Sequence, residues 1–250
     1  MKTKYSIHPN YKKHQTFLLK TLTQFEEHGS VLVNGERNVI KKFEDGDEVF
    51  IVKKFKNPNF IQRWVYQFLR KSKAKRSYEY ANLLVDKAIK TPAPVMYLEN
   101  FSGGLKQSYY VSAYIEYDFD FRTLIHNPKW ANRKEILEQF TRYTFLLHEH
   151  NIRFLDHSPG NTLVVTTNNT SHDFYLIDLN RMRFQELNLQ QRMKNFRRLW
   201  LSKGMIQQMA PVYAKLYGSS VEETQSWMLH YSRKFQKKVN SKKLRRRKLI

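Results

Sequence analysis

The chain has 250 residues, 41% of them hydrophobic and 14% aromatic, which supplies enough apolar material for a buried core and excludes disorder throughout. Lys and Arg number 44 against 22 Asp and Glu, and the net charge of +22 favours polyanionic partners such as nucleic acid, anionic lipid or phosphorylated glycan without choosing among them. The absence of Cys excludes disulfides and cysteine-ligated zinc, and no run approaches the ~20 apolar residues of a membrane-spanning helix.

The first half of the chain has the pattern of a sheet with a helical insertion. The Met1–Tyr5 segment leads into polar sequence rather than an apolar signal region, which predicts a cytosolic protein. Apolar residues at helical spacing then predict a helix over 11–27. Hairpin signals at Asn34-Gly35 and Asp45-Gly46 separate the first strands, and one or two helices are predicted over 60–88. The five strands predicted for one sheet are 31–33, 39–43, 49–55, 95–98 and 109–115.

The second half is predicted to be mainly helical. A helix is expected over 131–149, and two short strands, 162–165 and 174–177, flank a polar hairpin. Further helices are expected over 188–203, 205–217 and 221–238. His148, His150 and His157 lie close together in the sequence without metal-ligand spacing, so we interpret them as packing or loop residues.

The stretch Phe154-Leu155-Asp156-His157-Ser158-Pro159-Gly160-Asn161 and the later Leu176-Ile177-Asp178-Leu179-Asn180-Arg181 carry the strongest chemical signal. Kinases place an Asp five residues before an Asn at the mouth of a β-hairpin and a second Asp at the end of the returning strand. This spacing predicts Asp156 as the base that accepts the hydroxyl proton, and Asn161 and Asp178 as metal ligands. The alternative is an ordinary turn, because these residue types favour turns for backbone reasons.

The upstream half offers the other parts of a kinase in the correct order. Lys53, in the predicted strand 49–55, is the candidate for holding the ATP phosphates, and Glu79, in the next helix, is its candidate partner. Lys54 points to the opposite face of the strand and remains an alternative. The competing interpretations are a solvated lysine at a sheet edge and a Glu79 that pairs with Lys75 on the helix surface.

Of the predicted kinase elements, the nucleotide-binding loop matches the kinase pattern least well. Gly35 is the single glycine between the first two strands, where protein kinases carry several, although its backbone can still cap phosphates. Phe154-Leu155 replaces the usual His-Arg before the catalytic Asp, and Leu179-Asn180 replaces Phe-Gly after Asp178. These departures argue against a regulated protein kinase.

Two blocks, 70–81 and 155–181, together with Val-Lys-x-Phe-Lys and Thr-Pro-x-Pro, resemble the bacterial lipopolysaccharide core kinases, the Kdo/heptose kinase family. The resemblance runs from about residue 31 to 200. It implies an α+β, two-lobed protein-kinase-like fold, with an N-lobe at 1–117, a helical C-lobe at 118–235 and a basic tail at 236–250. It also implies ATP- and Mg²⁺-dependent phosphorylation of a Kdo or heptose hydroxyl on lipid A-linked core saccharide at the cytoplasmic membrane face.

Two segments suggest how the protein meets a membrane. Residues 233–250 carry ten Lys and Arg and no acid, which suits an anionic lipid surface, although a solvated disordered extension is an equal alternative. Trp64, Tyr66 and Phe68 lie beside basic residues, which suits a membrane interface, but helical spacing favours Trp64 and Phe68 as core residues.

Three other functions stay open from sequence alone. An atypical protein kinase or small-metabolite kinase would share the same residues, but about ten residues between Asp178 and the next helix leave little room for a protein-docking loop. A non-catalytic nucleic-acid-binding protein would explain the charge but not Asp156, Asn161 and Asp178, so we expect no nucleic-acid partner. A degenerate kinase fold used only for binding is also conceivable, and the sequence does not determine the oligomeric state.

Overall fold

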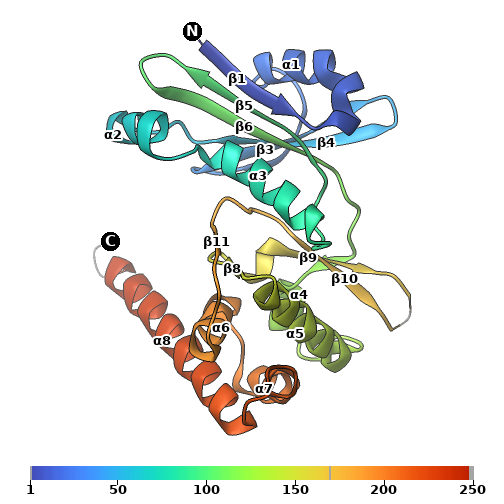
Figure 1. The fold of residues 1–250 in the computed structure, drawn as a ribbon, viewed down its shortest axis with the longest axis vertical. Helices are drawn as coiled ribbons and strands as arrows, with labels where there is room; N and C mark the ends of the chain where they lie inside the picture. Colours follow the sequence, from blue (N-terminus) through green and yellow to red (C-terminus); the bar gives the residue numbers. More distant parts are fainter. Residues whose placement is uncertain (1, 169, 248–250) are drawn as a thin grey trace. The chain divides into compact units, whose positions relative to one another are not determined.

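The computed structural model describes residues 2–168 and 170–247, and the chain divides into two compact units, Met1–Ile115 and Glu116–Ile250 (Figure 1). The first unit is a six-stranded antiparallel sheet with helices. Its strands are arranged in the order β1-β5-β6-β4-β3-β2. Their bounds are β1 Lys2–Ile7, β2 Ser30–Asn34, β3 Asn38–Asp45, β4 Glu48–Phe55, β5 Pro94–Phe101 and β6 Leu105–Ala113. The five predicted strands are therefore present, and β1 is a sixth that the pattern did not predict.

The two faces of this sheet carry different helices (Figure 1). The 3₁₀ helix η1 (Pro9–His14) leads into α1 (Gln15–Thr23), whose Leu18 and Leu22 pack on Phe50 and Val52 of the central strand. The predicted helix over 11–27 is thus shorter and begins with a 3₁₀ segment. The other helices of this unit are α2 (Phe60–Trp64), the π-helical η2 (Val65–Leu69) and α3 (Lys73–Asp86), of which α3 packs against β5 and β6.

Helix α3 begins at Lys73, inside the basic run 70–76 in the middle of the predicted helical region 60–88. The Ser72 hydroxyl accepts a hydrogen bond from the Lys75 backbone N–H at 3.0 Å, which is the geometry of an N-cap. Trp64 in α2 is 54% exposed, so its prediction as a core residue is wrong. The side chain of Phe68, for which the same prediction was made, lies outside the described part of the structure.

The second unit is mainly helical, with short strands that frame one loop. Strands β9 (Thr162–Thr166) and β10 (His172–Leu176) form the predicted hairpin, and β7 (Phe119–Asp120) pairs with β9. Strands β8 (Ile152–Phe154) and β11 (Met182–Phe184) form a second antiparallel pair that the sequence did not predict. The helices are α4 Arg122–His126, α5 Arg133–Glu149, η3 Pro159–Asn161, α6 Leu189–Asn195, η4 Phe196–Leu199, α7 Lys203–Tyr217 and α8 Val221–Arg247.

The core of the second unit joins its helices to the β9–β10 hairpin. Phe140 of α5 contacts Phe174 of β10 with ring centroids 5.4 Å apart, and Phe196 contacts Tyr213 of α7 at 5.7 Å. All four belong to one buried apolar cluster. Burying an aromatic side chain of this kind contributes about 1.5–3 kcal/mol, and Phe140 and Phe196 also contact the ring of His157 in the loop that follows β8.

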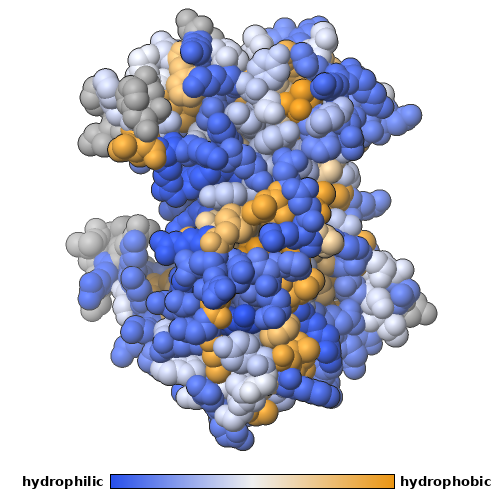
Figure 2. Space-filling view, in the orientation of Figure 1, coloured by the Kyte–Doolittle hydropathy of each residue, from blue (hydrophilic) through white to orange (hydrophobic). Residues whose placement is uncertain are grey.

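Helix α8 extends further than the sequence predicted. It continues through residues 236–247 to Arg247, so this part of the predicted basic tail is helical and not a disordered extension, while Lys248 and beyond lie outside the described residues. None of the helices in the described part of the chain is long and apolar enough to cross a bilayer. On the face drawn in Figure 2, hydrophilic residues predominate and hydrophobic ones gather in small areas.

Candidate active site

The loop that follows β8 holds Asp156 and Asn161 together in the second unit. The Asn161 Nδ2 donates to the Asp156 carbonyl oxygen at 2.8 Å, and the Ser158 N–H donates to the same oxygen at 2.7 Å. The Asn161 N–H donates to the Ser158 carbonyl at 3.0 Å within the 3₁₀ turn η3, where Pro159 is buried. These bonds occupy the amide nitrogen of Asn161 and leave its Oδ1 as the acceptor end of the side chain.

Asp178 lies at the end of β10, next to Asn161. The Ile177 N–H donates to the Asn161 carbonyl at 3.1 Å, which closes the mouth of the hairpin immediately before Asp178. Asp178 has a φ of 60°, in the left-handed region that non-glycine residues seldom adopt, and Asn180 Nδ2 donates to its Oδ1 at 2.5 Å. Such conformations cost on the order of 1 kcal/mol and concentrate at functional sites. The structure thus brings Asp156, Asn161 and Asp178 to one end of the β9–β10 hairpin.

A buried polar network supports β8 from below. Asn195 of α6 donates through Nδ2 to the Phe154 carbonyl at 2.6 Å, and its Oδ1 accepts from His148 Nε2 at 3.2 Å. His148 Nδ1 in turn accepts from the Tyr213 hydroxyl at 2.7 Å. This arrangement requires a neutral ring, and burial lowers the pKa of His148 to about 3. The network fixes the carbonyl two residues before Asp156.

His157, the residue after Asp156, is fully buried between aromatic rings. Its ring lies 5.5 Å from that of Phe140 and 5.8 Å from that of Phe154, measured between centroids. Neither ring nitrogen has a hydrogen-bond partner among the described residues, and burial lowers the pKa of His157 to about 3. His157 is therefore buried in the loop as a neutral ring, and both His148 and His157 pack in the interior of the second unit.

The Asp156 carboxylate makes two ion pairs that sequence reasoning missed. Arg198 Nη2 lies 2.7 Å from Oδ1, and Arg181 Nη1 lies 3.5 Å from Oδ2. Arg181 belongs to the quoted Ile-Asp-Leu-Asn-Arg block, but no pattern in the sequence singled out Arg198 in η4. Because the carboxylate is only 18% exposed, these two guanidinium groups fix its orientation.

Gly160 leaves room for another arginine beside the loop. A Cβ built at this position would overlap the guanidinium of Arg122, which is itself paired with Asp120 at 3.2 Å. Because the Arg122 side chain is 63% exposed and can move aside, this contact does not by itself require glycine, and the turn preference considered from sequence still stands.

In the first unit, the structure separates the two candidate lysines. Lys54 is ion-paired with Glu26 and lies over the ring of Phe25 at 5.8 Å, on the face that carries α1. Lys53 lies on the opposite face, in register with Tyr110. Tyr110 is in turn in register with Tyr97, and the Tyr97 ring lies 5.4 Å from that of Tyr78 in α3. Lys53 therefore shares the face of α3, the helix that carries Glu79.

Glu79 has an ion pair that the sequence did not predict. Both of its carboxylate oxygens accept from Lys71 Nζ, at 2.9 and 2.8 Å, in place of the Lys75 pairing considered from sequence. Burial, followed by the negative charges of Glu99 and Glu79, raises the pKa of Tyr97. The charge of Glu79 is therefore felt on the sheet row that contains Lys53, and the two hydrogen bonds from Lys71 orient the Glu79 carboxylate.

Gly35 lies in the connection between β2 and β3. Its N–H donates to the Asn38 carbonyl at 3.1 Å, and a Cβ there would meet only ordinary contacts, 3.5 Å or more away. Gly46 in the next turn has a positive φ of 62°, as a hairpin glycine is expected to have, whereas Gly35 is not among the positive-φ residues. Glycine at 35 is therefore not required by the backbone.

The residues at the hairpin end fit a hard divalent cation. The described part of the chain has no cluster of three or more His, Asp or Glu that could hold a metal ion. Asn161 offers an amide oxygen and Asp178 a carboxylate, and Mg²⁺ is commonly held by one or two such oxygens together with substrate phosphates and water. The donor set therefore suits a metal that arrives with a nucleotide better than a permanent metal centre.

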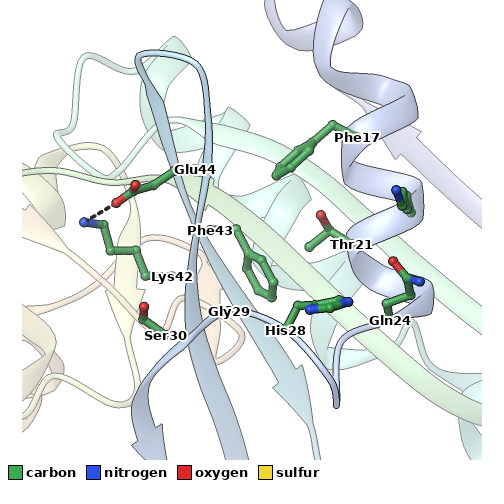
Figure 3. A pocket seen from close by; sticks show the side chains of 10 residues that line it. Phe17, Thr21, Gln24, His28, Gly29, Ser30, Lys42, Phe43 and Glu44 are labelled. Carbon is green, nitrogen blue, oxygen red and sulfur yellow. Dashed lines mark ion pairs between the residues drawn. The ribbon is translucent and has the colours of Figure 1, made fainter.

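A separate hollow of about 470 Å³ lies on the α1 side of the first unit (Figure 3). Its walls are the end of α1, the turn at Gly29 and strand β3, where Lys42 and Glu44 form an ion pair at 2.8 Å. The ring of Phe43 fills the space that a Cβ at Gly29 would need. None of the predicted site residues lines this hollow.

Comparisons with known proteins agree with this geometry. Residues 59–217 match the lipopolysaccharide kinase (Kdo/WaaP) family. The chain belongs to the lipopolysaccharide kinase (Kdo/WaaP) family. A solved structure described as WaaP in complex with acyl carrier protein is similar to this kinase with a TM-score of 0.64 and 15% identity, covering 93% of this chain and 99% of that one. No curated protein sequence matches the chain.

Family membership and structural similarity together confirm the predicted fold class and enzyme class. The fold is α+β and protein-kinase-like, and the protein is a phosphotransferase that phosphorylates a sugar hydroxyl in lipopolysaccharide biosynthesis. The matched segment begins after Lys53 and contains helix α3. It also contains all of the loop and hairpin that carry Asp156, Asn161 and Asp178.

Proposed function

We propose that this kinase transfers the γ-phosphate of ATP to a Kdo or heptose hydroxyl of the lipid A-linked inner core, with Asp156 as the base. The observation that carries the proposal is the loop after β8, in which Asn161 is bonded to the Asp156 carbonyl and closes the hairpin that ends at Asp178. Phosphoryl transfer requires this spatial set of one carboxylate for the acceptor and two oxygen ligands for the metal. Family membership favours a sugar acceptor over a protein hydroxyl.

Each residue has a separate task in the proposed reaction. The acceptor oxygen attacks the γ-phosphorus as the bond to the β-phosphate oxygen breaks, and the hydroxyl proton passes to Asp156, so that ADP leaves. Asn161 and Asp178 would hold Mg²⁺, which would neutralise charge on the phosphates. Lys53 is the candidate phosphate-binding lysine, since Lys54 is engaged with Glu26 on the other face of β4. Gly35 contributes backbone amides to the nucleotide loop at most, because its own conformation is ordinary.

The membrane part of the proposal rests on α8. Residues 233–245 of this helix expose seven basic side chains, Arg233, Lys234, Lys237, Lys238, Lys242, Lys243 and Arg245. Each cation near an anionic leaflet contributes ~1 kcal/mol, so the set is sufficient for reversible docking. We place the enzyme at the cytoplasmic face of the membrane that carries its lipid A-linked acceptor, held there by this helix.

The test incubates wild type and Asp156→Asn with γ-labelled ATP and Mg²⁺. Three reactions are compared, which contain Kdo-bearing lipid A, a protein mixture or no acceptor. We expect label in the lipid fraction with wild type, and a loss of about 10²–10⁴-fold in the variant, the usual contribution of a general base. The variant should retain nucleotide binding, measured by fluorescence of an ATP analogue. Label in protein instead of lipid would replace the sugar acceptor by a protein one, and an active variant would remove Asp156 from its role.

A further inference from the structure

Five arginines lie on or beside the β8–β11 pair and the 3₁₀ helix η4 of the second unit, and two of them, Arg181 and Arg198, pair with the Asp156 carboxylate. Strands β8 and β11 are distant in sequence but adjacent in this short sheet. The five arginines are Arg153, Arg181, Arg183, Arg197 and Arg198, and we call them the arginine cluster. Arg181 and Arg183 are exposed, and the other three are half-buried.

Two members of the cluster face each other across the short sheet. Arg183 of β11 is in direct register with Arg153 of β8. Ile152 and Phe154 point inward and are fully buried, so alternation along the strand places Arg153 on the outer side, together with Arg183. Like charges directly opposite on neighbouring strands are destabilising. An anion between the two guanidinium groups would remove this repulsion.

The half-buried Arg197 lies close enough to three other arginines of the cluster to feel their charges. Burial, followed by the positive charges of Arg153, Arg198 and Arg181, lowers the pKa of Arg197. The pKa of Arg153 is likewise lowered by burial and then by the charge of Arg183. In the described part of the structure, the cluster makes two ion pairs, and both are with the Asp156 carboxylate. Five cations against one anion leave a strong local excess of positive charge.

We propose that the arginine cluster is a subsite that binds an anionic group, a carboxylate or a phosphate, of the acceptor saccharide beside the hydroxyl served by Asp156. This inference rests on the proposed function. It assigns the cluster to the acceptor and not to ATP because Arg181 and Arg198 contact the proposed base, whereas the proposed metal ligand Asp178 is held by the β9–β10 hairpin. Arg fits such groups because its planar fork binds carboxylate and phosphate with two parallel hydrogen bonds.

The test replaces the cross-strand pair in the double variant Arg153→Gln/Arg183→Gln. The matched control is Arg142→Gln/Lys215→Gln, which removes two exposed charges from α5 and α7 of the same unit. With Kdo-bearing lipid A as acceptor, we expect the acceptor KM of the double variant to rise about 10- to 100-fold, as expected for the loss of charge-assisted hydrogen bonds. The KM for ATP should stay within about twofold, and the control should match wild type in both constants.

A second readout is independent of catalysis. Inorganic phosphate should raise the melting temperature of wild type and control more than that of the double variant, because only the first two retain the anion subsite. Without phosphate the double variant should be at least as stable as wild type, since a like-charge pair is gone. This comparison detects the anion subsite even if the acceptor in the proposed function is mistaken.

Two modified acceptors identify the anionic group with the wild-type enzyme. One carries the Kdo carboxylate as a methyl ester, and the other lacks the lipid A phosphates. A raised KM for the ester assigns the subsite to the carboxylate, and a raised KM for the second assigns it to phosphate. The inference is overturned if neither modification matters, if the double variant raises the KM for ATP instead, or if it behaves like the control in both assays.

Discussion

At the scale of single residues, the base candidate is held from both sides. Its main-chain carbonyl accepts two hydrogen bonds from its own loop, and its carboxylate is paired with Arg198 and Arg181. A carboxylate fixed in this way presents one orientation to an incoming hydroxyl, which lowers the entropic cost of reaching a reactive geometry. The arginines therefore position Asp156, and they bring positive charge to the place where the acceptor must bind.

The neighbouring His157 should make the protein sensitive to acid. Burial lowers its pKa from 6.5 to about 3, so the folded chain keeps the ring neutral while the unfolded chain takes up a proton below pH 6.5. Stability is therefore present above pH 6.5 and is lost as the pH falls toward 3, by about 1.4 kcal/mol for each pH unit and each such histidine. His148, whose pKa is also about 3, contributes in the same direction.

The substitution His157→Phe separates the contribution of His157 to the pH dependence of stability from that of His148. Phenylalanine keeps the ring among Phe140, Phe154 and Phe196 and has no nitrogen to leave without a partner. We expect similar urea stability of wild type and variant at pH 8, and a weaker loss of stability in the variant between pH 6 and 4.5, measured by urea unfolding at each pH. Parallel stability curves for the two proteins over this range would contradict the assignment.

At the scale of elements, the end of α1 depends on a lysine from the sheet. Lys41 of β3 is 6% exposed, and its ammonium donates to the carbonyls of Phe25 at 2.6 Å, Glu26 at 3.1 Å and His28 at 2.9 Å. These carbonyls follow the last turn of α1, where helices leave acceptors without intrahelical donors. A buried charge with three hydrogen bonds compensates for its own desolvation and fixes the segment that leads into β2.

Adjacent lysines provide a matched test of this role. Lys41→Met keeps the apolar stem but leaves the carbonyls without their donor, and we expect a loss of about 2–4 kcal/mol in unfolding free energy. Lys42→Met removes the pair with Glu44, whose side chain is 63% exposed, and the contact of Lys42 Nζ with the Tyr114 ring at 5.7 Å, and it should change stability by about 1 kcal/mol or less. Chemical denaturation of both variants measures the difference. Equal effects would show that the Lys41 contacts contribute no more than a surface pair.

Edge and surface elements explain where the sequence patterns failed. Strand β1 pairs with β5 at the edge of the sheet, and its residues are exposed or half-exposed. Its sequence therefore lacks the alternation of apolar and polar residues that predicts a strand. Strands β8 and β11 are only three residues long, and each has one arginine between two apolar residues, which is too short a run to show a period. Strand β4, which is long and has one buried face, was predicted within one residue.

At the scale of the whole molecule, the net charge of +22 should govern binding to lipid surfaces. We expect the triple variant Lys237→Gln/Lys238→Gln/Lys242→Gln in α8 to bind vesicles of anionic phospholipid about tenfold or more weakly than wild type, since each cation contributes ~1 kcal/mol near the surface. Binding should also weaken with salt, because exposed charges are screened. Sedimentation with vesicles at two salt concentrations measures both effects.

The control for the membrane prediction removes the same charge from the other unit. Lys2, Lys12 and Lys13 are exposed in the first unit, and their replacement by Gln should weaken vesicle binding less than the α8 variant does. If the two triple variants lose affinity equally, binding follows net charge alone and α8 has no special role. If neither loses affinity, the membrane contact is made elsewhere.

The sequence by itself determined the alternation of strands and helices, the Asp156, Asn161 and Asp178 spacing and the kinase family, because hydrophobic periodicity and catalytic spacing are local properties of the chain. Only the tertiary structure decided that Lys54 is engaged with Glu26, that Lys71 holds Glu79 and that Arg198 reaches Asp156. Arg198 lies 42 residues after Asp156, and the Arg153–Arg183 pair requires a strand register. Such contacts depend on how distant segments pack, which no local pattern records.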